Sequence, residues 1–489
     1  MILAWILFCV YLIGTSYLGW VGYKKTSDFG SFAIGKGDLS PFVVGITLAA
    51  STASAATFII NPGFVYVDGL SAWINMVLGT FTGFMFMLII LSFKFRRMGE
   101  KMKALTIPDW IGKRYKSDNF SLYFSIINLL SFAFVVLLVG GISIVMQNLL
   151  QVSNITALLI TLIFVTGYVF LGGTYAHVYT NMLQGILMII VTIAVLMTGI
   201  KLMIDSGDMG FWEQIRQVDP NLLAPINYKG HLFNDFFSIY ITGFFIGAAV
   251  VCQPHILTKA LYVKSDKAVR NYIWIFGIVF LLFLLLVSAG FFALVKVPVE
   301  QLTDPVTGVF RQDLVMTVYL KNAFPDWSFT LVSVVLLAAA MSTLDGLLVG
   351  ISTITANDLI LNLIKKIGHK HLSQEQKMKI AFKASHIILV VIAILVFLVN
   401  INPPKLLGIF GQVGVYGMVL AVVPPVLTGI LFNNVPIKLV WSTSIIAMST
   451  HFILYFFGQQ LFPNSTLTFA NPAVTATIAI FRGLTPALS

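Results

Sequence analysis

Long apolar segments separated by short polar stretches run along almost the whole chain. An apolar segment of about 18 residues or more is long enough to cross a bilayer as a helix. Such segments predict twelve spans, at 2–22, 41–63, 69–93, 121–147, 154–171, 180–204, 234–256, 270–295, 327–356, 378–399, 405–431 and 436–457. A weaker segment, 472–486, predicts a thirteenth. The expected fold class is an all-α polytopic membrane protein with about 13 transmembrane helices.

The composition agrees with this pattern. The chain has 489 residues, of which 58% are hydrophobic and only 10% are charged, whereas about a quarter of the residues of a soluble domain are charged. An ordinary soluble enzyme, a disordered protein and a nucleic-acid-binding domain are therefore excluded, and the lipid bilayer is the expected partner. The two cysteines, Cys9 and Cys252, lie in apolar segments and form no disulfide framework or zinc motif.

The basic residues indicate an orientation. With the N-terminus outside, the predicted inner loops and C-terminus hold 23 Lys and Arg and the outer loops hold 7. Cytoplasmic loops of membrane proteins carry such an excess. The net charge of +11 thus records orientation in the cell (inner) membrane. The two longest loops, 205–233 and 297–326, lie outside and are expected to form short amphipathic helices or lids.

The second predicted span is unusually polar. It contains four hydroxyl side chains within seven residues, Ser51, Thr52, Ser54 and Thr57, and Pro62 follows them. Hydroxyl side chains compete for backbone hydrogen bonds and weaken a helix. Small residues also permit close helix packing, which is the structural alternative. The functional interpretation is a locally unwound helix whose carbonyls and hydroxyls line a site at mid-membrane depth.

The seventh predicted span carries a matching interruption. It contains Gly243 and Gly247 and ends at Gln253-Pro254-His255. Broken helices five spans apart are typical of five-plus-five inverted repeats, whose site lies at the repeat interface. The expected organisation is 1–40 as a first helix with its loop, 41–233 as the first repeat (spans 2–6), 234–431 as the second repeat (spans 7–11) and 432–489 as additional helices.

The ninth predicted span contains Ser342, Thr343 and Asp345. We interpret Asp345 as the only acidic residue well inside a span. A carboxylate at that depth costs several kcal/mol unless it is paired, protonated or bound to a cation. A polar contact between helices is the structural alternative. Hydroxyl and carboxylate oxygens are hard ligands that suit small hard cations.

These motifs resemble the sodium:solute symporter family, and the chain looks most similar to its pantothenate and proline permease branch. The resemblance implies a leucine-transporter-like fold and Na⁺-driven uptake of a small molecule by alternating access. It rests on Phe32-Ala-Ile-Gly-Lys, Ala50-Ser-Thr-Ala-Ser-Ala, Leu171-Gly-Gly-Thr, Asn181-Met-Leu-Gln184, Gln253-Pro-His255, Ala339-Ala-Met-Ser-Thr-Leu344 and Ser352-Thr-Ile-Thr.

The resemblance also implies a Na⁺ site. Its oxygens correspond to the backbone carbonyls of Ala50, Ala53 and Ala339 and the hydroxyls of Ser342 and Thr343.

Two positions depart from the family pattern. Many members have Asp where this chain has Asn181, and a small polar residue where it has Asp345. We therefore hypothesise a second cation site formed by Asp345, Asn181 and Ser342. A proton-titrated Asp345 is the competing hypothesis.

The substrate is expected to be pantothenate-like or another small carboxylate. Na⁺ symport of proline or another amino acid, and proton-coupled transport through Asp345, are the alternatives. A channel, a transporter-derived sensor and an enzyme are disfavoured, since neither a filter loop nor a catalytic constellation is evident. The substrate-binding candidates are Ser51, Thr52, Ser54, Thr57, Trp73, Phe244, Phe245 and Gln253.

Overall fold

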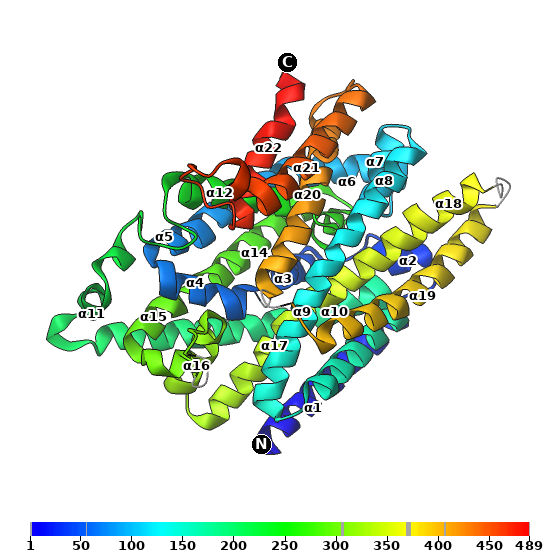
Figure 1. Cartoon of the computed structure of the whole chain (residues 1–489). Coiled ribbons are helices and arrows are strands. Elements are labelled where there is room, and N and C mark those ends of the chain that lie inside the picture. Colours follow the sequence, from blue (N-terminus) through cyan, green and yellow to red (C-terminus); the bar gives the residue numbers. More distant parts are fainter. Residues whose placement is uncertain (1, 55, 305–307, 368–372, 405–406, 489) are drawn as a thin grey trace.

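The computed structural model describes residues 2–54, 56–304, 308–367, 373–404 and 407–488 as a bundle of helices joined by short connections (Figure 1). Within these residues, the β-type pairing is a single bridge between Thr303 and Phe310. The α-helices are α1 Ile2–Tyr23, α2 Phe29–Ile34, α3 Pro41–Thr52, α4 Asn61–Asp68, α5 Leu70–Trp73, α6 Thr80–Met102, α7 Ile107–Arg114, α8 Asp118–Asn128, α9 Phe132–Leu150, α10 Asn154–Ile204, α11 Phe211–Val218, α12 Thr242–Val250, α13 Pro254–Leu257, α14 Asp266–Leu285, α15 Ala289–Lys296, α16 Val315–Ala323, α17 Asp326–Ile354, α18 Leu361–Lys366, α19 Gln374–Ile401, α20 Leu407–Leu431, α21 Ile437–Leu461 and α22 Pro472–Leu488.

The long helices agree with a multi-pass membrane protein. The described chain has nine helical segments long and apolar enough to cross a membrane, and up to eleven if each of two bent helix pairs is one span. One of the nine, α10, has 51 residues and would be about 76 Å long if straight, more than twice the bilayer core. Gly173, at φ 48° and ψ −130°, interrupts it between the predicted fifth and sixth spans. The weak thirteenth segment is helical as α22 and packs on α21, while the total of thirteen spans stays a prediction.

The two predicted interruptions are confirmed. The pair Pro41–Thr52 and Ala56–Asp68 bends by 58°, and the pair Phe237–Val250 and Pro254–Tyr262 bends by 65°. The first break follows the run of small and hydroxyl residues. At the second break, Pro254 begins the new half-helix, where its missing N–H costs nothing. The predicted outer loops also contain short helices, among them α11 and α16.

Helix contacts follow the pattern that an inverted repeat produces. The first broken helix, α3, packs on α14, and the second, α12, packs on α6. In the numbering of the predicted spans, span 2 contacts span 8 and span 7 contacts span 3. The operation that relates the two predicted repeats exchanges span 2 with span 7 and span 3 with span 8, so it converts one contact into the other. Likewise α9 packs on α20, and α17 packs on α10. The repeat boundaries at 41–233 and 234–431 stay predictions.

The contact between α6 and α12 depends on glycine. Gly79 and Gly83 face Gly243 and Gly247, each pair four residues apart, which is the spacing that lets membrane helices approach closely. A Cβ atom at Gly83 would lie 1.9 Å from the backbone oxygen of Phe244. The second broken helix is therefore held against α6 by backbone contact.

We expect Gly83→Ala to lower the free energy of unfolding by about 1–3 kcal/mol, because the added methyl group forces two backbones apart. Gly167→Ala is the matched control, since no heavy atom lies within 4 Å of its added Cβ. Thermal unfolding in detergent measures both. Equal midpoints for the two variants would contradict the close packing of α6 on α12.

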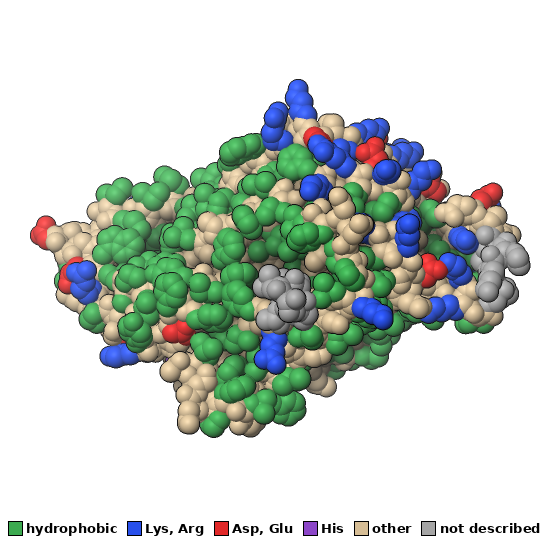
Figure 2. Space-filling model, turned by 90° about the horizontal axis from the view of Figure 1, so that it is seen from above, with side chains coloured by type: hydrophobic (Ala, Val, Ile, Leu, Met, Phe, Trp, Pro, Cys, Tyr) green, Lys and Arg blue, Asp and Glu red, His purple; other side chains and the backbone are tan. Residues whose placement is uncertain are grey.

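Charged side chains are unevenly distributed over the surface. Figure 2 shows Lys and Arg concentrated toward one end of the molecule and a broad apolar surface over the rest of that face. This distribution is the one that the predicted orientation requires, and the orientation itself stays a prediction. Lys370 and Lys405, counted among the loop charges, lie outside the described residues.

The helix that carries Asp345 buries a second carboxylate, and the prediction that Asp345 is the only acidic residue well inside a span stays a prediction. The ninth span does not end at 356 but continues through a π-helical turn and α18 to Lys366. Asp358 is thereby buried, and it accepts hydrogen bonds from the hydroxyls of Thr106 (2.5 Å) and Ser121 (3.1 Å).

Candidate functional site

The first helix break releases a backbone carbonyl. The amide of Ala53 still donates to Ala49 O (2.9 Å), but the amide of Ser54 turns back to Thr52 O (3.0 Å). In a continuous helix that amide would bond to Ala50 O. The Ala50 carbonyl therefore leaves the helical ladder at the C-terminal end of α3, where the helix dipole is negative.

Two hydroxyls of α17 meet this helix end. Ser342 Oγ lies 2.8 Å from Ala50 O and 2.7 Å from Ala339 O. Thr343 Oγ1 lies 3.0 Å from the carbonyl oxygen of Ser51. All of these residues are buried. The structure thus brings together three of the five predicted sodium ligands, Ala50, Ala339 and Ser342. The Thr343 hydroxyl bonds instead to the carbonyl of Ser51, next to Ala50.

Ala53, the remaining predicted ligand, ends α3 with φ −81° and ψ 78°. Among the described residues, no hydrogen bond joins its carbonyl to α17.

The oxygens at this point fit a small hard cation. Each is a neutral carbonyl or hydroxyl, the ligand type that hard cations prefer. Carbonyls at the ends of broken helices coordinate Na⁺ in secondary transporters. The donor set contains no soft sulfur or imidazole ligand among the described residues, and none of the described His, Cys, Asp and Glu side chains form a metal-binding group of three or more.

Asn181 lies beside this oxygen cluster, as predicted. Its Nδ2 donates to Ser342 O and to Ser51 Oγ, each at 2.8 Å. Its Oδ1 is buried and has no hydrogen-bond partner among the described residues. Asn181 therefore supports the backbone of α17 and leaves one oxygen available near Ser342.

Asp345 faces a different set of groups. Its Oδ2 accepts hydrogen bonds from Tyr168 (2.9 Å) and Thr180 (3.1 Å), and its Oδ1 lies 2.8 Å from His177 Nδ1. These three donors all come from α10. Within the described chain no hydrogen bond joins Asp345 to Asn181 or Ser342. The Asp345 carboxylate already accepts hydrogen bonds from protein donors. A second cation site formed by Asp345, Asn181 and Ser342 stays a hypothesis.

Lys259, one of the 23 basic residues counted in the predicted inner loops, is instead part of this network. Its side chain is fully buried, because the half-helix Pro254–Tyr262 bends back into the bundle. Nζ lies 3.1 Å from His177 Nε2, 3.0 Å from Ser51 Oγ and 3.1 Å from Thr47 O. An ammonium group only donates, so with Lys259 charged, His177 Nε2 accepts and Nδ1–H donates to Asp345. In that protonation state, the positive charge of Lys259 compensates Asp345 through a neutral imidazole.

Sequence reasoning overlooked Tyr168, His177 and Lys259. One signal was available for His177, which precedes Asn181 by four residues and so shares its helix face. Lys259 gave a weaker signal, since it lies in the mainly apolar stretch Ile256-Leu-Thr-Lys-Ala-Leu-Tyr-Val263. Hydropathy alone assigns such a lysine to a loop.

A cavity of ≈ 200 Å³ lies next to the oxygen cluster. Residues of the first break, α12, α14, α20 and the start of α22 contribute to its wall. Four predicted substrate-binding residues line it: Ser51, Thr52, Thr57 and Gln253. The described residues of its wall include no Asp, Glu, Lys or Arg. The site therefore combines a small, largely apolar cavity that carries several uncharged polar groups with a cation-type oxygen cluster on the same helix break.

The other four substrate-binding candidates do not belong to the described wall of this cavity. Ser54 instead accepts a hydrogen bond from the amide of Ala56 (3.2 Å), and the indole of Trp73 donates to Ser288 Oγ (2.9 Å).

The two aromatic candidates on α12 pack against neighbouring rings. Phe244 contacts Phe86, and Phe245 contacts Phe481. Their neighbours Ile246 and Val250 face the cavity instead.

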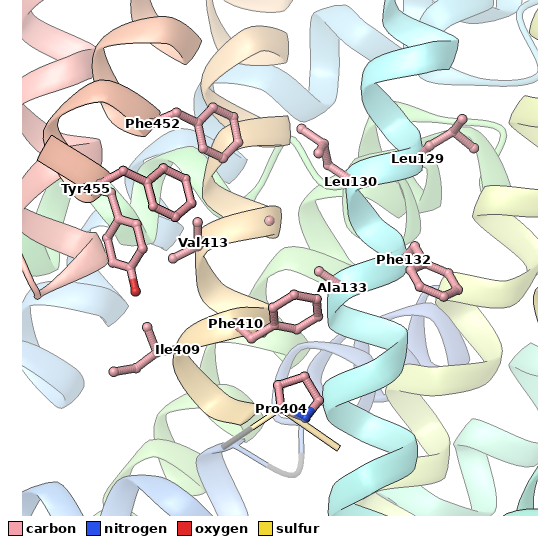
Figure 3. A pocket seen from close by; sticks show the side chains of 12 residues that line it. Leu129, Leu130, Phe132, Ala133, Pro404, Ile409, Phe410, Val413, Phe452 and Tyr455 are labelled. Carbon is pink, nitrogen blue, oxygen red and sulfur yellow. The ribbon is translucent and has the colours of Figure 1, made fainter. Parts of the chain in front are cut away.

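A second hollow, of ≈ 440 Å³, lies between α9, α20 and α21. Figure 3 shows aliphatic and aromatic side chains around it, with the Tyr455 hydroxyl as the one polar side-chain group labelled. It offers few hydrogen-bonding groups for a polar solute, so the cavity at the helix breaks is the candidate site.

Two broken helices, with carbonyls of one facing buried hydroxyls of a third helix, define a secondary transporter. Residues 32–438 match the sodium:solute symporter family. The chain belongs to the sodium:solute symporter family. It is thus a multi-pass transporter rather than an enzyme. Membership of this family supports Na⁺-coupled transport of a small molecule.

Relatives with assigned substrates are distant. The chain is 27% identical to the sodium/pantothenate symporter of Haemophilus influenzae over 465 residues, covering 94% of this chain and 91% of that protein. It is 24% identical to the sodium/proline symporter of Escherichia coli over 415 residues, covering 82% and 78%. The structure of a Na⁺-coupled sialic acid symporter matches with a TM-score of 0.76 at 15% identity, covering 100% and 98%. This likeness confirms the predicted leucine-transporter-like fold.

Proposed function

We propose that this chain takes up a small organic metabolite, pantothenate-like or another small carboxylate, together with Na⁺ by alternating access. The observation that carries the proposal is the convergence of Ser342 Oγ with the carbonyls of Ala50 and Ala339 at the first helix break. The N-terminus faces outside in this proposal, and the protein resides in the cell (inner) membrane.

In this proposal Na⁺ binds between two elements that belong to different repeats. Ala50, with Ala53, supplies carbonyls from α3, and Ser342, with Thr343, supplies hydroxyls from α17. An ion held by both elements favours the conformation in which they are close. Since a ligand shifts a conformational equilibrium only through its different affinity for the two states, this placement gives Na⁺ a means to drive the change.

The solute would bind in the adjacent cavity. Ser51 connects the two sites, because its carbonyl accepts from Thr343 and the residue is part of the cavity wall. Filling the cation site would therefore fix the backbone beside the solute cavity. The names of the relatives place pantothenate first and proline second among solutes to test.

Sodium alone should stabilise the purified protein against thermal unfolding. We expect KCl at equal ionic strength to give no such increase, because the larger ion fits the oxygen cluster poorly. At a Na⁺ concentration 100 times the dissociation constant, the free energy of unfolding should rise by about 2.7 kcal/mol. Equal responses to NaCl and KCl would contradict a Na⁺ site.

Uptake into proteoliposomes then separates the candidate functions. Pantothenate accumulation driven by an inward Na⁺ gradient supports the proposal, and proline accumulation supports the amino-acid alternative. Accumulation driven by a proton gradient without Na⁺ would favour the proton-coupled alternative instead.

A further inference from the structure

A hollow of ≈ 490 Å³ lies beside the C-terminal end of α6. Its wall is formed by the last two turns of α6, by α2 with the connection that follows it, and by the segment 261–264. Since α6 ends the apolar helical segment Leu70–Met102, the hollow lies where this span leaves the bilayer. None of its described wall residues belongs to the solute cavity.

Three lysines of this wall are exposed and unpaired. They are Lys36, Lys103 and Lys264. Among the described residues, no hydrogen bond or ion pair engages their ammonium groups. Each ammonium group ends a flexible four-carbon stem. Because the three lysines line the same hollow, they can turn toward one ligand.

The acidic residues of the wall are already engaged. Asp28 accepts from the amide of Ser31 (2.8 Å) and from Ser27 Oγ (3.2 Å). Glu100 Oε2 accepts from the guanidinium of Arg96 (2.8 Å). The wall thus holds four basic residues against two acidic ones, and its unpaired charges are all positive. A hollow with this balance attracts an anion.

Arg96 fixes the shape of the hollow. It is 7% exposed, and its guanidinium also donates to Lys264 O (3.0 Å) and to Asp266 Oδ1 (2.7 Å). These bonds tie the backbone that carries Lys264 to α6. The hollow is therefore held in shape before a ligand arrives, which lowers the entropy that binding costs.

The position and the wall indicate the kind of anion. Apolar residues share the wall with the lysines, and they are Ile34, Leu105, Leu261 and Val263. Anionic lipid headgroups lie at the bilayer surface and attract basic residues near the ends of membrane helices. We propose that this hollow binds the phosphate of an anionic lipid headgroup. Leu261 belongs to the half-helix Pro254–Tyr262, so the headgroup contacts α6 and the second broken helix together.

Thermal unfolding of the full chain in detergent tests the proposal. Dioleoyl phosphatidylglycerol, which is anionic, should raise the midpoint at a lower concentration than zwitterionic dioleoyl phosphatidylcholine. Lys36→Gln, Lys103→Gln and Lys264→Gln should each weaken the apparent affinity for phosphatidylglycerol by about 5-fold, and their combination by about 100-fold. Since these side chains are exposed and unpaired, the variants should fold normally.

A second triple variant is the matched control. Lys94→Gln, Lys101→Gln and Lys267→Gln remove the same charge from exposed positions on α6 and α14 that are not part of the wall. This variant should keep most of the affinity for phosphatidylglycerol. Equal losses in the two triple variants would overturn the proposal, because they would show diffuse attraction to the whole basic surface.

Soluble phosphates test the source of the anion. If glycerol phosphate or inorganic phosphate gave the full lysine-dependent shift and phosphatidylglycerol added nothing, the lipid assignment would be wrong. Equal responses to phosphatidylglycerol and phosphatidylcholine would exclude selection of an anion in the hollow.

Discussion

Lys259→Met should abolish Na⁺-driven uptake and lower the free energy of unfolding by about 3 kcal/mol. The substitution leaves the Asp345 carboxylate buried without a compensating positive charge, and breaking a buried charge pair costs about 3–5 kcal/mol. We expect the lower end because His177 separates the two charges. Thermal unfolding in detergent and uptake into proteoliposomes measure the two effects.

Two variants show whether charge balance is the cause. Lys259→Met combined with Asp345→Asn removes both charges and should recover most of the lost stability, so that the double-mutant cycle gives a coupling energy well above the error of about 0.5 kcal/mol. Lys379→Met is the control, since Lys379 pairs with Glu375 on the exposed surface of α19 and surface pairs contribute little. Additive losses in the double variant would refute the compensation of Asp345 by Lys259.

Ser342→Ala should weaken Na⁺ binding by about 10–100-fold. The hydroxyl is the group that lies within 2.8 Å of both Ala50 O and Ala339 O, and losing one interaction with a charged group costs about 1.5–3 kcal/mol. The Na⁺ dependence of the unfolding midpoint gives the dissociation constant. Uptake at low Na⁺ should fall accordingly and partly recover at high Na⁺.

Ser444→Ala controls for the loss of a buried hydroxyl. Ser444 is also fully buried and donates to a backbone carbonyl, that of Ala421 (2.8 Å), but it joins α21 to α20. We expect this variant to lose stability without a change in Na⁺ affinity. If both variants shifted the Na⁺ dependence equally, Ser342 would have no special role in cation binding.

Much of the fold follows from the sequence. The apolar segments locate the long helices, since a bilayer accepts only backbone whose hydrogen bonds are satisfied internally. The two helix breaks also follow from the local sequence, because hydroxyl side chains near Ser51 weaken the first helix and Pro254 begins a new half-helix at the second break. The oxygen cluster at Ala50, Ala339 and Ser342 was predicted from motif resemblance, and the structure brings these residues together.

The cavity wall was only half predictable. Ser51, Thr52, Thr57 and Gln253 lie on it because a broken helix turns its residues toward the site. Phe244 and Phe245 do not, since which face of α12 meets the cavity depends on the glycine contact with α6 and on the position of α22. A sequence pattern gives the period of a helix but not its rotation among several neighbours that are all apolar.

The sequence by itself determined the class of protein, the two helix breaks and the hard oxygen ligands, because each is a local property of one segment in a bilayer. Only the tertiary structure decided the partners of the buried charges. Lys259 appears in sequence as one more basic residue near a loop, and Asp345 as a lone acid. They become a compensated pair through His177 only when three segments, more than 80 residues apart along the chain, pack so closely that water is excluded and each polar group must find a protein partner.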